Sequence, residues 1–188
     1  MSQAIQRTMA VREITYCSLF TALIAIGAYI KVPVPLVPFT LQFLFTNMAG
    51  LLLGKKLGGL SVAVYVAAGL AGLPVFAGGG GPAYILQPTF GYLIGFVFGS
   101  MAAGAIREKS ESVSFKRLLF AGFVNIFIVY FFGMVWYYAV SNFYLNSPVG
   151  VKALFIYCFA LAVPGDIALC FIGAYMTRRL LPVLRRSF

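Results

Sequence analysis

Asp166 is an acidic side chain inside a long apolar segment, a combination that indicates a functional site. The chain has only four acidic residues: Glu13, Glu108, Glu111 and Asp166. The glutamates lie at or beyond the ends of apolar runs, whereas Asp166 lies mid-segment in "LFIYCFALAVPGDIALCFIGAYM", where Pro164 is expected to bend the helix. A carboxylate so placed needs a partner or a polar cavity. Asp166 is predicted to contact a ligand or carry a proton; a structural ion pair is the alternative, although no basic residue is expected at that depth.

A second group of polar residues follows a proline-rich connection. The segment "KVPVPLVPFTLQ" holds three prolines that keep the chain extended, and it then delivers Thr40 and Gln42 to the start of an apolar run. These two side chains are candidate ligand contacts.

The segment "PVFAGGGGPAYILQPTFGYLIGF" places four consecutive glycines, Gly78–Gly81, before Tyr84, Gln87 and Thr89. Glycines can offer several backbone N–H groups to one anion, or let the chain pass close over a ligand. A flexible tip is the ordinary alternative. The aromatic and polar residues after the glycines favour a binding loop, and the amide of Gln87 is expected to point into a cavity.

The sequence lacks the residues and motifs that enzymes commonly use for catalysis. The chain has no histidine, no phosphate-binding GxxxxGK[ST] motif, and no serine or cysteine beside a plausible base. Its three cysteines, Cys17, Cys158 and Cys170, lie in apolar runs without paired spacing, so we expect neither a metal site nor a disulfide. The sequence predicts a protein that is not an enzyme and has no cofactor.

The elements that must position these residues are membrane spans. Of 188 residues 62% are hydrophobic and 10% charged, and the mean hydropathy is +0.96; a soluble domain needs more charge to cover its surface. We predict one all-α integral membrane domain over residues 1–188, with six transmembrane helices. The predicted spans are residues 13–30, 37–54, 57–73, 85–106, 118–140 and 154–177.

The basic residues are sorted by topology. If the N-terminus is inside, twelve of fourteen fall on the inner face and only Lys31 and Lys152 on the outer face. This split obeys the positive-inside rule and predicts that both termini are cytoplasmic. It also argues against nucleic-acid binding, and contact with anionic lipid is the simpler explanation of the net charge of +10.

Small residues recur along two predicted spans. Gly91, Gly95 and Gly99 are expected to let helices pack closely within the chain. The first span carries a similar face, which we predict to dock another membrane protein, with internal packing as the alternative; this face comprises Ser18, Ala22, Ala25 and Ala28.

Three motifs resemble the BioY family, the biotin-capturing S-components of energy-coupling factor (ECF) vitamin importers of prokaryotic cell membranes. They are "VPVPLVPFTLQ", "GLAGLPVFAGGGGPAYILQPTFGYLIGF" and "VPGDIALC", in order along the chain. The resemblance implies a six-helix S-component fold and high-affinity capture of biotin at the outer face. It also implies a T-component and two ATPase subunits as partners.

The resemblance assigns roles to the candidate residues. Asp166 would accept the ureido N–H groups of biotin, and Thr40, Gln42 or Gln87 would donate to the ureido oxygen. Lys31 or the backbone of Gly78–Gly81 would bind the valerate carboxylate. The apolar part would be covered by Phe39, Tyr84, Phe90 and Trp136. The family often has a lysine three residues after the aspartate, where this chain has Leu169, so that contact is not assigned.

Two other classes of function stay open at this point. A proton-coupled secondary transporter of a small organic acid would use Asp166 as its titrating group. A non-transporting membrane scaffold would use the small-residue faces to recruit partners.

Overall fold

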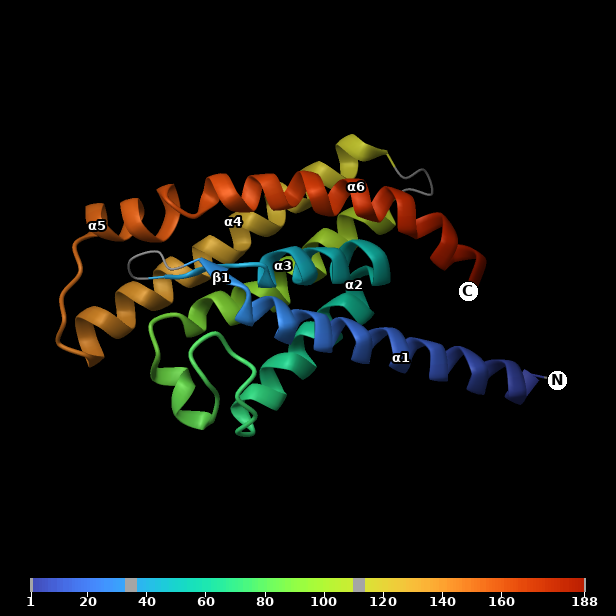
Figure 1. The fold of residues 1–188 in the computed structure, drawn as a ribbon, viewed down its shortest axis with the longest axis horizontal. Coiled ribbons are helices and arrows are strands. Elements are labelled where there is room, and N and C mark those ends of the chain that lie inside the picture. Colours follow the sequence, from blue (N-terminus) through green and yellow to red (C-terminus); the bar gives the residue numbers. More distant parts are fainter. Residues whose placement is uncertain (1, 33–36, 110–113, 188) are drawn as a thin grey trace.

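The structure is a computed structural model that describes residues 2–32, 37–109 and 114–187. It is a bundle of long helices that run back and forth along one axis (Figure 1). The elements in chain order are α1 (Ser2–Tyr29), β1 (Lys31–Val32), β2 (Phe39–Thr40), α2 (Gln42–Leu70), the 3₁₀ helix η1 (Pro82–Leu86), α3 (Phe90–Glu108), α4 (Phe115–Ala139), the π-helix η2 (Val140–Tyr144), α5 (Val151–Phe155), the π-helix η3 (Ile156–Ala160) and α6 (Val163–Ser187).

The second and third predicted spans form the single element α2, which is broken at Gly54. Gly54 has φ 85° and ψ −176°, outside the helical region, and glycine takes such a conformation without a steric penalty. The chain reverses there: a Cβ on Gly58 would lie 2.6 Å from the Cα of Gly50. The two halves, residues 42–53 and 55–70, therefore pack against each other.

Two neighbouring residues at the end of α3 satisfy the helix ends exposed by this break. A carboxylate oxygen of Glu108 accepts a hydrogen bond from the backbone N–H of Lys55 at 2.9 Å, and the Arg107 guanidinium donates to the carbonyl of Leu52 at 3.4 Å. An anion at a helix N-terminus and a cation at a C-terminus both complement the helix dipole. The break is thus built into the fold.

Among the described residues, five helical segments are long and apolar enough to cross a membrane. They are Val11–Tyr29, Gln42–Leu70, Phe90–Glu108, Phe115–Tyr144 and Val151–Leu184. The chain is therefore a multi-pass membrane protein, as the sequence predicts. The prediction of six spans stays a prediction, because the halves of α2 count here as one candidate span. Both termini lie at the same end of the bundle (Figure 1).

Asp166 lies near the middle of the candidate span Val151–Leu184, as the sequence predicts, but this span is not one continuous α-helix. A turn at Leu161 and Ala162 separates η3 from α6, and Asp166 lies in the first turn of α6. Pro164 is thus in a first helical turn, where its missing N–H leaves no gap in the hydrogen bonding. The carboxylate also lies near the positive end of the α6 dipole.

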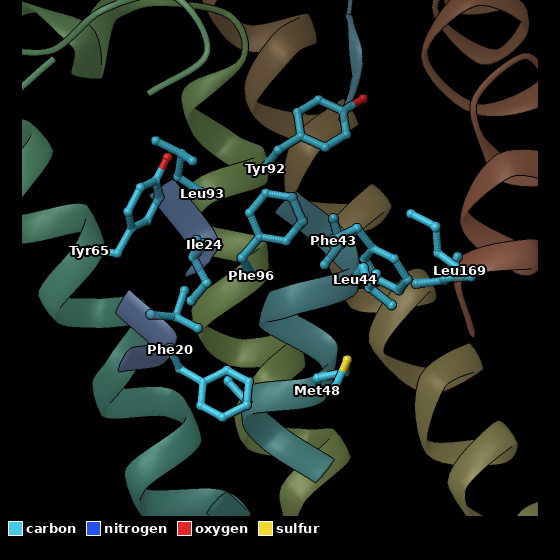
Figure 2. Close-up of a cluster of buried hydrophobic side chains, with 14 of the residues drawn as sticks. Phe20, Ile24, Phe43, Leu44, Met48, Tyr65, Tyr92, Leu93, Phe96 and Leu169 are labelled. Atoms are coloured by element: carbon cyan, nitrogen blue, oxygen red, sulfur yellow. The ribbon is translucent and has the colours of Figure 1, made fainter. Parts of the chain in front are cut away.

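Aromatic and aliphatic side chains from several helices make the main core. Figure 2 shows Phe20, Ile24, Phe43 and Phe96 among these side chains, contributed by α1, α2 and α3. The predicted close packing of the small residues is confirmed between α3 and α4, because a Cβ on Gly95 would lie 2.7 Å from the Cα of Val129.

A polar pair lies within this apolar bundle. The Asn125 amide of α4 donates to the amide oxygen of Asn47 of α2 at 3.0 Å, and both side chains are fully buried. Gly99 makes room for the pair, because a Cβ there would lie 2.0 Å from the Asn125 oxygen. An interhelical hydrogen bond of this kind holds helices in register inside a membrane.

Candidate functional site

A cavity of about 220 Å³ lies between the β1–β2 hairpin, the glycine segment, η1, the first turns of α2, α3 and α6, and the middle of α4. Most of its wall is apolar, with a few polar groups, as is usual for small-molecule sites. Its lining residues come from 37–43, 77–96, 129–130 and 162–166. They are Val37, Pro38, Phe39, Thr40, Gln42, Phe43, Ala77, Gly78, Tyr84, Gln87, Thr89, Tyr92, Leu93, Phe96, Val129, Tyr130, Ala162 and Asp166.

Asp166 lies in the cavity wall and is 6% exposed. Its Oδ2 accepts a hydrogen bond from the Tyr130 hydroxyl at 2.5 Å, which joins α6 to α4. In the part of the chain that the structure describes, Asp166 has no ion pair, so the ion-pair alternative finds no support. The Asp166 carboxylate therefore faces a cavity, as the sequence predicts.

The amide of Gln42 also faces the cavity from the first residue of α2. Its side chain is buried, and its Nε2 atom makes no hydrogen bond of normal geometry among the described residues, although the Tyr65 hydroxyl is a polar neighbour. An unpaired buried donor costs free energy unless a ligand or water supplies an acceptor. Gln42 is therefore well placed to donate to an oxygen of a bound molecule.

Phe39 of β2 closes the cavity beside Asp166. Its ring packs against Gly165, where a Cβ would lie 2.6 Å from the ring. The neighbouring Thr40 also lines the cavity. The hairpin is held by the pairing of Lys31 with Thr40 and of Val32 with Phe39. Of the residues between the strands, 33–36 lie outside the described part of the chain. The prediction that the proline-rich connection is extended therefore stays a prediction.

The glycine segment contributes less of the cavity than the sequence indicates. Gly78 lines it together with Tyr84, Gln87 and Thr89, but Gly79, Gly80 and Gly81 do not. The Gly79 N–H donates to the Phe76 carbonyl and the Gly81 N–H to the Gly69 carbonyl. These two N–H groups are therefore not free to form an anion-binding nest.

Three further predicted residues also lie outside the lining set. Phe90 and Trp136 pack edge to face, with ring centroids 5.7 Å apart. Lys31 donates from Nζ to the carbonyl of Ala77 at 3.0 Å, and Ala77 itself lines the cavity. Lys31 thus lies at the rim.

Sequence reasoning missed the tyrosines of the wall. Tyr130 bonds Asp166, and Tyr92 donates to the carbonyl of Cys158 in η3 at 3.3 Å. Phe43, Leu93, Phe96 and Val129 complete the apolar wall. A phenol within an apolar span needs a partner for its hydroxyl, but this requirement applies to every tyrosine of these spans and does not single out Tyr130 or Tyr92.

The predicted docking face lies along a second groove, between α1 and the second half of α2. This groove has a volume of about 490 Å³, and Ser18, Ala22 and Ala25 line it together with Leu57, Leu60 and Val64. Ala28 is fully buried within the bundle. Ala28 is therefore not part of an exposed face, and its inclusion in the predicted set is corrected.

A bundle of apolar helices with a mostly apolar cavity and a few convergent polar groups at one end defines a multi-pass membrane protein with a small-molecule site. The chain belongs to the BioY family, whose family model matches residues 1–186. It is 41% identical over 170 residues to a probable biotin transporter BioY of Lysinibacillus sphaericus, covering 90% of this chain and 87% of that protein.

Two further comparisons agree. A biotin transporter BioY of Thermotoga maritima is 43% identical over 137 residues, covering 72% of this chain and 78% of that protein. The fold matches the crystal structure of the S-component for biotin from an ECF-type ABC transporter with a TM-score of 0.78, at 32% identity and 92% coverage of each chain. The S-component fold implied by the sequence motifs is therefore confirmed, and these relatives are transport proteins, not enzymes.

Proposed function

We propose that this chain captures biotin at the outer face of the cell membrane, with high affinity, as the S-component of an ECF-type importer. The observation that carries the proposal is the buried carboxylate of Asp166 in the cavity wall, in a chain whose relatives are named biotin transporters.

The polar groups of the cavity match the chemistry of biotin. Its ureido ring has two N–H donors and one carbonyl acceptor. Asp166 therefore accepts from an N–H, and the Nε2 atom of Gln42 donates to the carbonyl. Phe39, Phe43 and Phe96 cover the apolar bicycle. The valerate extends toward the rim, within reach of Thr40, Gln87 or Lys31.

The orientation follows from charge. The turn between the two halves of α2 and the C-terminal end of α3, which carry Lys55 and Arg107, lie toward the end of the bundle that holds both termini, whereas the cavity loops lie at the opposite end (Figure 1). Under the positive-inside rule, the end with the termini is cytoplasmic and the cavity opens outward.

The energising partner docks on the groove lined by Ser18, Ala22 and Ala25. Small side chains allow a close approach of a second helix, which is the main source of helix affinity in lipid. In this proposal a T-component contacts the groove, and two ATPase subunits supply the energy, because the chain has no phosphate-binding motif of its own.

Equilibrium binding to the purified protein tests the proposal. Biotin and desthiobiotin, which both carry the ureido ring, should bind; lipoate, which has a similar acid chain on a ring without N–H groups, should not. Binding of lipoate as tight as that of biotin would overturn the proposal. The alternative of a proton-coupled carrier is not favoured, since the relatives compared include the S-component of an ABC transporter.

A further inference from the structure

The hydrogen bond between Tyr130 and Asp166 has a direction that bears on ligand choice. The phenol donates to Oδ2, and no donor from the described residues reaches Oδ1. Both residues line the cavity. One carboxylate oxygen is therefore occupied by the protein, and the other is left for a ligand.

The Tyr130 ring is held firmly enough to orient its partner. It meets the Tyr92 ring edge to face, with centroids 5.9 Å apart, and the Phe159 ring edge to face at 5.3 Å. The Tyr92 hydroxyl is itself engaged by the Cys158 carbonyl. A side chain locked by packing fixes the geometry of the group that it bonds.

We propose that Tyr130 is a positioning residue that holds Asp166 so that its Oδ1 atom accepts a hydrogen bond from a single N–H of the bound ring. The pair would thereby select ligands in which that ureido nitrogen carries a hydrogen. This inference rests on the proposed function. Because the two N–H groups of a cyclic urea flank its carbonyl on opposite sides, a single oxygen can accept from only one of them.

The pair also sets the polarity of the ligand in the cavity. A buried acceptor repels a ligand carboxylate and rejects a ring whose N–H has been replaced, because its lone pairs would then be left unpaired. The acidic end of the ligand is consequently directed away from Asp166, toward the hairpin and the glycine segment.

The test measures discrimination between ligands. Dissociation constants are measured for biotin and for biotin methylated on one or the other ureido nitrogen, with wild-type protein and with Tyr130→Phe. For wild-type protein, the dissociation constant of one methyl isomer should be at least about tenfold higher than that of biotin, as expected for the loss of a buried hydrogen bond. In Tyr130→Phe, the dissociation constant of biotin should rise by about tenfold, whereas that of the rejected isomer should change little. The ratio of the two constants should therefore fall.

Tyr137→Phe is the matched control. Tyr137 is a buried tyrosine on the same helix, two turns away and outside the cavity, so this change should leave the ratio of the dissociation constants as in wild type. A double variant with Asp166→Asn completes the cycle: in that background, Tyr130→Phe should no longer change the ratio.

A merely structural Tyr130 gives a different result. In that case Tyr130→Phe weakens all ligands equally or none, and either outcome overturns the inference while wild-type biotin binding still supports the proposed function. Absence of biotin binding to the folded wild type would overturn both. Should Tyr130→Phe not fold, fluorotyrosine at position 130, which donates more strongly, should shift biotin affinity and spare the methylated isomer; equal shifts would overturn the inference.

Discussion

The Nζ atom of Lys31 donates a hydrogen bond to the carbonyl oxygen of Ala77 at 3.0 Å, which ties the hairpin to the glycine segment over the cavity. The Tyr29 hydroxyl makes a parallel link to the carbonyl of Pro74. An ammonium group has three donors, so Lys31 can hold this link and still reach an anion at the cavity mouth.

Lys31→Met should therefore weaken biotin binding and speed its release. Lys31 bonds the Ala77 carbonyl and is expected also to contact the valerate carboxylate of bound biotin. The substitution should therefore cost biotin more affinity than biotinamide, whose side chain is neutral. Rates of release measured for both ligands check this. An equal loss for the two would mean that Lys31 only joins the two segments. Lys152→Met, at the other lysine that the positive-inside rule predicts to lie outside, serves as the control.

Asp166→Asn should weaken biotin binding by about 1–3 kcal/mol, or roughly ten- to a hundredfold, because an amide must also place donors where the carboxylate only accepts. Isothermal titration measures the effect, with the melting temperature as a check that the variant is folded. An unchanged dissociation constant in a folded variant would remove Asp166 from the site.

Gly80→Ala should displace the glycine segment Gly78–Gly81, whereas Gly150→Ala should not. A Cβ on Gly80 would lie 2.1 Å from the Leu73 carbonyl oxygen, while a Cβ on Gly150 would meet no atom within 4 Å. Because the Leu73 oxygen belongs to the backbone, the segment must shift, and we expect weaker biotin binding for Gly80→Ala alone. Equal affinities of the two variants would show that the position of this segment does not matter for binding.

Ala22→Leu or Ala25→Leu should spare biotin binding and abolish ATP-driven uptake, because a larger side chain fills the groove on α1 where the partner is proposed to dock. Thr15→Leu, an exposed position on α1 outside the groove, is the control. The readouts are biotin binding to the purified chain and uptake by cells. A parallel loss of binding and uptake would place the groove in internal packing.

Asn125→Ala should lower the thermal stability of the protein in detergent, because it leaves the amide of Asn47 buried without its partner. Interhelical bonds of this kind are worth about 0.6 kcal/mol on average and up to about 1.7 kcal/mol. Asn142→Ala, at a less buried amide, should have a smaller effect on the melting temperature. Equal melting temperatures for wild type and Asn125→Ala would mean that the pair contributes nothing to stability.

The amino-acid sequence by itself determined the class of the protein and the identity of its main polar residue. Long apolar runs, whose lengths are set by the thickness of a bilayer, predict the spans. A single carboxylate in such a run predicts a site, because burial without a partner is too costly. Asp166 was found in this way, and Thr40 and Gln42 were found from their place after the proline-rich segment; all three line the cavity.

Only the tertiary structure decided which residues meet Asp166. Tyr130 is 36 residues away along the chain, and nothing in its local sequence distinguishes it from the other tyrosines of α4. Tertiary packing also decided the surroundings of Ala28, Phe90 and Gly81. Their types favoured a docking face, an aromatic cover and a binding loop, but Ala28 is buried, Phe90 packs against Trp136 and the Gly81 N–H is bonded to Gly69. Residue type and spacing report the depth and the helix face of a side chain, whereas its partners depend on how the helices pack, and close packing is a property of the whole bundle.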